Sequence, residues 1–240
     1  MTILEVNGFG KAFTIHHLNK RIPAVGQVQF TLHTGEFIGI IGKSGSGKST
    51  ILKSIYRTYL PDRGEILYNS KQFGKIDLAR ATEREIIFLR KNEIGYVSQF
   101  LNVMPRTTCR ELVQNALLEM GEIKENAQVE AEKVLTHFEM DAELWDSYPK
   151  TFSGGEKLRL NIAIATVKKP RLLLLDEPTA SLDQKSKIKV REMIEKLKHQ
   201  GTTLIGIFHD IEFMEGLCDK VFEMKSNKVS VASDGVLHEG

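Results

Sequence analysis

The segment of residues 42–49 carries the residues most suited to chemistry. It reads GKSGSGKS and fits the pattern G-x-x-x-x-G-K-[ST], between an isoleucine-rich apolar run at residues 36–42 and a helical stretch at residues 49–56. Glycines in such a loop let backbone N–H groups curve around a phosphate. Lys48 is expected to reach the β- and γ-phosphates of a nucleotide, and the Ser49 hydroxyl to ligate Mg²⁺. Phosphate contacts are predicted at Gly42, Lys43, Ser44, Gly45, Ser46, Gly47, Lys48, Ser49 and Thr50.

Two adjacent carboxylates follow a second apolar run. Residues 171–178 read RLLLLDEP, and four leucines in a row predict a buried strand that carries Asp176 to its carboxyl end. There Asp176 can hold the Mg²⁺ shell, and Glu177 is placed to polarise an attacking water. A phosphate loop alone leaves GTPases, kinases and many ATPases open. The carboxylate pair favours hydrolysis of the bound nucleotide.

A serine and two glycines form a third group. Ser153, Gly154 and Gly155 precede the helical run KLRLNIAIATV. At a helix start, unpaired N–H groups and the helix dipole make an anion site, although a plain N-cap has the same residues. Two phosphate-seeking helix ends in one chain indicate that two chains share each nucleotide.

Together these segments resemble the ATP-binding-cassette ATPase family over roughly residues 3–225, with every motif in order. Gln99 in YVSQF is similar to the Q-loop of that family, Asp183 in ASLD to its D-loop, and His209 in IFHD to its switch histidine. Phe13 in KAFTIH is similar in position to the aromatic residue that stacks on adenine. The alternative for Phe13 is an ordinary core aromatic in a β-strand.

The resemblance implies an ATPase that binds ATP and Mg²⁺ and works as a dimer. Glu177 would orient the attacking water and His209 would contact the γ-phosphate. Gln99 would contribute to the metal site, sense the γ-phosphate and couple it to a helical subdomain. Asp183 would bridge the protomers, and residues 153–155 of one chain would close over the nucleotide of the other.

The elements that must position these residues predict an α/β fold. Apolar runs at residues 36–42, 171–178 and 202–208 alternate with helical patterns, which indicates a mostly parallel sheet with right-handed crossovers. Residues 3–32 predict an antiparallel β subdomain, and residues 99–158 an inserted helical one. The expected division of the single domain is a core of residues 1–98 and 159–225, the helical insertion and a weakly patterned tail at residues 226–240.

Composition narrows the partners. The chain of 240 residues has 33 basic and 31 acidic residues, so the net charge of +2 predicts no direct nucleic-acid partner. Its two cysteines, Cys109 and Cys218, have neither disulfide-framework nor zinc-site spacing, which fits a reducing cytoplasm. Apolar runs stop well short of the roughly 18–20 residues that cross a bilayer. In a membrane process, a partner is therefore expected to supply the spanning segments.

A narrower resemblance concerns residues 98–106, SQFLNVMPR, and residues 206–210, GIFHD. Both resemble the PhnL subfamily of the bacterial carbon–phosphorus lyase system for phosphonate metabolism. This implies a homodimer, or a heterodimer with a related cassette, docked on the lyase core complex, with residues 100–106 as the docking candidate. Glu156 and Ile164 depart from the wider family, where glutamine and arginine are more common.

Two other functions remain open at this stage. One is the ATPase of a membrane transporter of the lipoprotein-release or macrolide-export type, with a permease as its partner. The other is a nucleotide-gated interaction module with negligible turnover, which an intact Glu177 and His209 disfavour.

Overall fold

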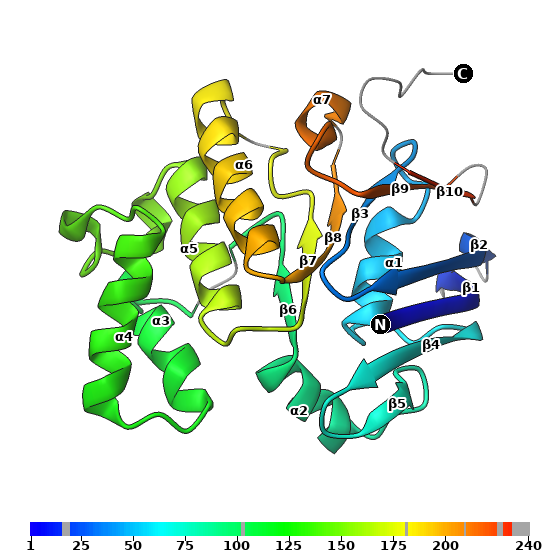
Figure 1. The fold of residues 1–240 in the computed structure, drawn as a ribbon, viewed down its shortest axis with the longest axis horizontal. Helices are drawn as coiled ribbons and strands as arrows, with labels where there is room; N and C mark the ends of the chain where they lie inside the picture. The colour runs from blue at the N-terminus through cyan, green and yellow to red at the C-terminus, as the bar shows by residue number, and fades with distance from the viewer. Residues whose placement is uncertain (16–19, 102–103, 181, 209, 225–227, 232–240) are drawn as a thin grey trace.

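The computed structural model describes residues 1–15, 20–101, 104–180, 182–208, 210–224 and 228–231. These residues form two sheets with helices packed around them (Figure 1). The antiparallel sheet lies at one end of the molecule and the helices α3 and α4 at the other, with the central sheet between them. The fold is the predicted α/β class.

The central sheet has six strands in the order β10-β9-β3-β8-β7-β6. The strands are β3 (Phe37–Ile41), β6 (Ile94–Val97), β7 (Leu172–Asp176), β8 (Thr203–Ile207), β9 (Lys220–Glu223) and β10 (Lys228–Val231). All pair in parallel except β10, which runs antiparallel to β9. Because β3 and β7 are parallel, their carboxyl ends meet at one edge of the sheet, and this edge carries the predicted site.

The predicted antiparallel subdomain is a four-stranded sheet in the order β2-β1-β4-β5. Its strands are β1 (Thr2–Ile15), β2 (Lys20–His33), β4 (Arg63–Ser70) and β5 (Gly74–Asp77). Strands β1 and β2 each run for 14 residues although both contain glycine, such as Gly8 in β1 and Gly26 in β2. Register shifts between Val6 and Phe9 and between Phe9 and Lys11 absorb the irregularity, as β-bulges do.

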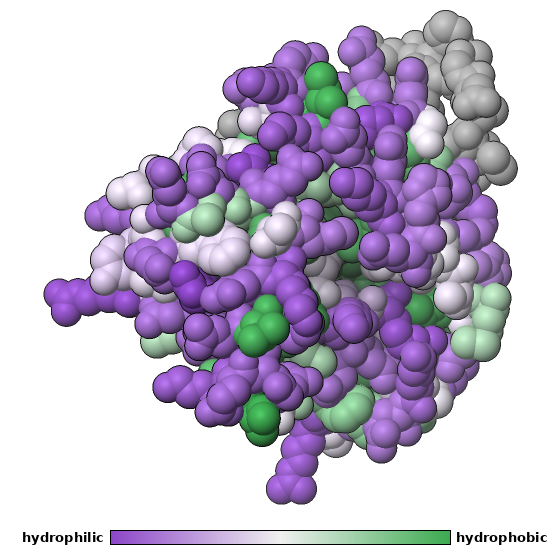
Figure 2. Space-filling view, turned by 60° about the vertical axis from the view of Figure 1, so that its left-hand side comes forward, coloured by the Kyte–Doolittle hydropathy of each residue, from purple (hydrophilic) through white to green (hydrophobic). Residues whose placement is uncertain are grey.

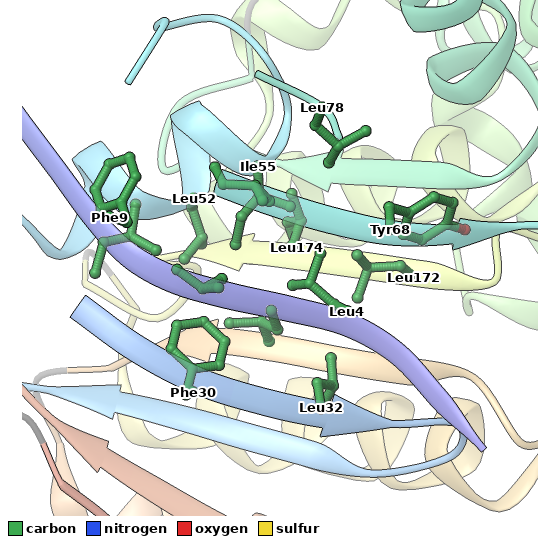
Figure 3. Packing of buried hydrophobic residues seen from close by; sticks show 14 of the residues in the cluster. Leu4, Phe9, Phe30, Leu32, Leu52, Ile55, Tyr68, Leu78, Leu172 and Leu174 are labelled. Carbon is green, nitrogen blue, oxygen red and sulfur yellow. The ribbon is translucent and has the colours of Figure 1, made fainter. Parts of the chain in front are cut away.

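The main core lies between the two sheets. Helix α1 (Lys48–Ile55) contributes Leu52 and Ile55, which pack against side chains of both sheets (Figure 3). The other labelled members of this cluster are Leu4, Phe9, Phe30, Leu32, Tyr68, Leu78, Leu172 and Leu174. This packing fixes the helix that begins at the phosphate loop relative to the strand that ends at Asp176.

The other helices begin and end at identifiable signals. They are α2 (Glu83–Asn92), α3 (Cys109–Glu119), α4 (Lys124–His137), α5 (Gly154–Thr166), α6 (Gln184–His199) and α7 (Ile211–Met214), with 3-10 turns at Ala142–Leu144 and Pro149–Thr151. Capping boxes start α2, α3 and α5, where a Thr or Ser hydroxyl and a Glu three residues later satisfy each other's backbone N–H groups. One face of α6 is apolar and buried, with Val190, Met193, Ile194 and Leu197.

The helical region has its own core. Ala127, Ala131 and Leu135 of α4 are buried, as their spacing predicts, and pack with α3 and part of α5. Helix α5 spans the predicted boundary at residues 158/159. Leu160 packs in the helical cluster, whereas Leu158 packs against the central sheet. One helix therefore joins the two packing units.

The C-terminal part of the chain adds a strand to the central sheet. Within residues 226–240, where weak patterning predicted a tail, residues 228–231 form β10 at the edge of the central sheet.

Of the helices in the described parts of the chain, none combines the length and apolarity needed to span a bilayer. The face in Figure 2 is mostly hydrophilic, with separated hydrophobic spots.

Candidate functional site

The phosphate loop wraps around its own lysine. Lys48 is the first residue of α1 and only 4% exposed. Its ammonium donates hydrogen bonds to the carbonyls of Gly42 at 2.8 Å and Lys43 at 3.2 Å. Because an ammonium has three N–H groups, one remains for a phosphate oxygen. The loop therefore holds a buried positive charge next to exposed backbone N–H groups, which suits a polyanionic ligand.

Two glycines in this loop face different surroundings. Gly47 caps α1 with φ 90°, and a Cβ built on it would lie 2.1 Å from Val25 Cγ2 and 2.5 Å from the Ala24 carbonyl oxygen. Gly45 has φ 78° and nothing within 4 Å of the same position. Strand β2 thus lies directly against the end of the loop at Gly47, a contact that the motif pattern does not reveal.

Asp176 lies at the end of β7 with both carboxylate oxygens engaged. Ser49 Oγ donates to Asp176 Oδ1 at 2.7 Å, and Tyr96 Oη donates to Oδ2 at 2.5 Å. Asp176 is 5% exposed. Burial and, next, the bond to Asp176 raise the pKa of Tyr96, so its phenol stays a donor at neutral pH. The predicted pair of Ser49 and Asp176 is brought together, and Tyr96 is a residue that the sequence analysis missed.

The donor set at this point fits Mg²⁺. A hydroxyl and a carboxylate are hard oxygen ligands, and Mg²⁺ is usually held by one or two such groups together with phosphate oxygens and water. Among the described residues no group of three or more His, Cys, Asp or Glu side chains could cage a metal by itself. Ser49 and Asp176 therefore suit a cation that arrives with a nucleotide.

Glu177 follows Asp176 in an unusual backbone conformation. Its φ is 52°, and its N–H donates to the Ile207 carbonyl at 3.2 Å, which ties it to the end of β8. A non-glycine residue in this region costs about 1 kcal/mol or more and is enriched at functional sites. The turn lets the chain leave the sheet edge directly after the two carboxylates.

The second helix end that the sequence predicts to bind an anion starts α5. Ser153 is the N-cap, and its hydroxyl accepts a hydrogen bond from the Glu156 N–H at 3.3 Å, while the Glu156 carboxylate accepts one from the Ser153 N–H at 2.7 Å. Glu156, a departure from the family pattern, is thus the partner in the capping box. Gly155 is buried, since a Cβ there would meet Ser186 Oγ of α6 at 2.8 Å. Ile164 is partly buried against the helical cluster.

This helix end does not join the phosphate loop within one chain. Ser153 and Gly154 are exposed, and among the described residues no hydrogen bond links them to residues 42–50. In Figure 1, α5 lies on the opposite side of β7 and β8 from α1. One chain therefore presents two separate phosphate-seeking surfaces.

The Q-loop segment follows β6. Gln99 is exposed and forms no side-chain hydrogen bond with the described residues. The preceding residue, Ser98, accepts a hydrogen bond at its carbonyl from Asn161 Nδ2 of α5 at 2.9 Å. Asn161, also missed from sequence, thus connects the start of the Q-loop to the helix that Ser153 caps.

Asp183 and Phe13 are predicted site residues outside the segments above. Asp183 is the N-cap of α6, where its carboxylate accepts the Ser186 N–H at 2.8 Å. Hydrogen bonds from the Ser186 side chain and then from its backbone lower the pKa of Asp183. Phe13 is 37% exposed on β1, with its ring centroid 5.2 Å from that of Tyr59. His209 lies outside the described residues.

The parallel sheet, the loop between β3 and α1, and the carboxylates at the end of β7 define a phosphate-loop nucleotide-binding protein. A family model described as ABC transporter matches residues 25–180. The chain is 34% identical over 204 residues to the cell division ATP-binding protein FtsE of Bacillus subtilis. The aligned residues cover 85% of this chain and 86% of FtsE. It is also 34% identical to the lipoprotein-releasing system ATP-binding protein LolD of Aquifex aeolicus, over 84% of this chain and 87% of LolD.

Among solved structures, the dimeric post-hydrolysis state of the ATP-binding cassette MJ0796 bound to ADP and Pi matches with a TM-score of 0.86. The two chains are 26% identical over 97% of this chain and 100% of that one. The chain belongs to the ABC transporter family of ATP-binding cassettes, and it is an ATPase.

Proposed function

We propose that this ATPase is the PhnL-like component of a carbon–phosphorus lyase system, in which closure of an ATP-bound dimer drives a conformational step in a partner complex. The observation that carries the proposal is the position of residues 98–101 and 104–106. Residues 98–106 resemble the PhnL subfamily in sequence, and their described part begins at the Q-loop and borders an apolar groove. A partner seated there would lie next to the nucleotide site.

The proposed reaction starts with ATP bound to one chain. Lys48 holds the β- and γ-phosphates, Phe13 stacks on adenine, and Ser49 and Asp176, joined by Gln99, hold Mg²⁺. Bound Mg²⁺ would neutralise charge that develops on the phosphate oxygens. Glu177 orients water for in-line attack on the γ-phosphate, and His209 contacts the γ-phosphate.

Dimerisation completes this site. Ser153, Gly154 and Gly155 of a second chain would supply N–H groups to the γ-phosphate, and Asp183 would bridge the protomers. The physical support is that each chain carries two separate helix ends suited to anions, which no described contact brings together. Loss of the γ-phosphate would remove the shared contacts and reopen the pair.

The groove suggests the chemistry of the partner. It encloses about 740 Å³ and is lined by Leu101, Met104, Pro105, Arg106, Thr107, Tyr148, Pro149, Lys150, Thr151 and Lys157. Met104 is 75% exposed, and none of the three basic side chains forms an ion pair with a described residue. An apolar segment with acidic residues would therefore fit, and its apolar side chains would cover exposed Met104 and Tyr148.

The test is a pull-down of the tagged chain from its native cell, which is grown on a phosphonate as the sole phosphorus source. The pull-down uses the soluble cytoplasmic fraction of these cells. Recovery of lyase subunits would support the proposal, and native mass spectrometry of the complex would distinguish a homodimer from a pair with a related cassette. Arg106→Glu together with Lys150→Glu is expected to reduce recovery without changing ATP turnover of the isolated chain.

A second candidate is the nucleotide-binding subunit of a membrane transporter. The names of the similar proteins favour it, since they include the lipoprotein-releasing ATP-binding protein LolD and the macrolide export ATP-binding/permease protein MacB. Recovery of an integral membrane permease, in place of lyase subunits, would establish this reading and refute the PhnL-like one.

A further inference from the structure

The Tyr96 ring packs against Tyr56 while its hydroxyl donates to Asp176. Its ring stacks on Tyr56, with centroids 4.9 Å apart and an interplanar angle of 31°. The guanidinium of Arg90 lies 4.7 Å from the centre of the Tyr56 ring, and Arg90 Nε donates to the Tyr56 carbonyl at 2.9 Å. The phenol therefore has little freedom to leave the carboxylate, because its ring is fixed by residues of α2 and of the end of α1.

The two hydrogen bonds to Asp176 have different roles in the proposed metal site. The Ser49 hydroxyl on Oδ1 belongs to the proposed Mg²⁺ site, where it must turn its oxygen toward the cation. Tyr96 on Oδ2 comes from β6, and three residues later the same strand leads to Gln99. The bond to Oδ2 restricts rotation of the carboxylate about its Cβ–Cγ bond and so favours the orientation in which Oδ1 faces Ser49.

We propose that Tyr96 is a positioning residue for the metal site: its hydroxyl fixes the orientation of Asp176, so that Oδ1 and the Ser49 hydroxyl are aligned before Mg²⁺ arrives. This inference rests on the nucleotide site proposed above. Partners that orient a metal ligand typically contribute 10–100-fold to metal affinity. Removing one neutral hydroxyl is expected to lie at the low end, at about tenfold.

The experiment measures binding of Mn²⁺, as a paramagnetic substitute for Mg²⁺, by electron paramagnetic resonance in the presence of ADP. Tyr96→Phe keeps the stacked ring and removes only the hydroxyl, and its Mn²⁺ affinity is expected to fall about tenfold. Its affinity for ADP in excess chelator is expected to stay at the wild-type value. Tyr56→Phe is the matched control, because it changes the other ring of the same pair and leaves the Tyr96–Asp176 bond in place.

Three results would overturn the inference. Tyr96→Phe with Mn²⁺ affinity within twofold of wild type excludes the role, provided that Ser49→Ala does weaken Mn²⁺ binding. An equal loss in Tyr56→Phe assigns the effect to packing of the ring pair. If Ser49→Ala also leaves Mn²⁺ binding unchanged, the proposed nucleotide site itself fails, and with it the role of Tyr96.

Discussion

The contact between the phosphate loop and β2 predicts opposite tolerances at two glycines of one motif. Gly45→Ala and Gly47→Ala introduce the same methyl group, and both positions have a positive φ, 78° and 90°. The left-handed conformation costs a non-glycine residue about 1–2 kcal/mol in each case. Only at Gly47 does the methyl group also meet neighbouring atoms, with the Ala24 carbonyl oxygen at 2.5 Å. Since that oxygen belongs to the backbone, β2 or α1 must shift.

Overpacking of this kind adds about 1–3 kcal/mol. The free energy of unfolding should therefore fall by about 1.5 kcal/mol for Gly45→Ala and by about 3.5 kcal/mol for Gly47→Ala. For a chain of this size each kcal/mol lowers Tm by about 2–4 °C. Urea unfolding and thermal melts without nucleotide measure both variants, so that phosphate binding does not enter. Equal destabilisation of the two variants would show that β2 does not lie against the loop at Gly47.

Three further predictions concern the chemistry and the surface. Glu177→Gln should keep ATP binding, stop turnover and trap an ATP-bound dimer in size-exclusion chromatography; hydrolysis at the wild-type rate would refute its role. Glu156→Gln keeps the capping box with Ser153 but removes a negative charge beside the proposed γ-phosphate site. In a Glu177→Gln background, it should therefore lower the ATP concentration at which half of the chains are dimeric a few-fold. An unchanged half-dimerisation concentration would contradict this. Asp62 accepts the Ala12 N–H and bonds from nearby basic side chains, which lower its pKa from 3.8 to about 2. Because this pKa is lower in the folded state, the stabilisation is present above about pH 4 and is lost as the pH falls toward 2. Asp62→Asn should thus cost about 1 kcal/mol or less at pH 7 in urea unfolding, with the difference shrinking in acid; a pH-independent difference would contradict the assignment.

The sequence predicts what local patterns encode. The strand at residues 172–176 follows from its leucines, and the phosphate loop from its glycine spacing. The resemblance supplied the family, which the family model and the relatives confirm. The capping box at Ser153 was also accessible, because S-x-x-E before a helical run is its pattern, yet Glu156 was interpreted only as a departure.

What the sequence does not predict depends on register between distant segments. Tyr96 pairs with Leu174 across β6 and β7, and this parallel register brings its phenol to Asp176, two residues further along β7. Nothing in the order of residues 94–97 reveals that pairing. Likewise, nothing in the phosphate-loop pattern reveals that Ala24 and Val25 of β2 lie against Gly47. The bond from Asn161 to Ser98 needs α5 to cross next to the end of β6.

These long-range contacts link the parts of the proposed cycle. Tyr96 lies in β6 and Gln99 in the loop that follows it, so the predicted docking segment, residues 100–106, begins four residues after Tyr96. Asn161 fastens the same segment to the helix whose N-terminus would close over a second chain's nucleotide. A partner that displaces the start of this loop, at Ser98 and Gln99, would therefore act on the metal ligand and on the closing helix together. We expect the coupling between partner binding and dimer closure to act in both directions. If closure of the ATP-bound dimer alters this contact, a partner that alters the contact must in turn change the free energy of closure.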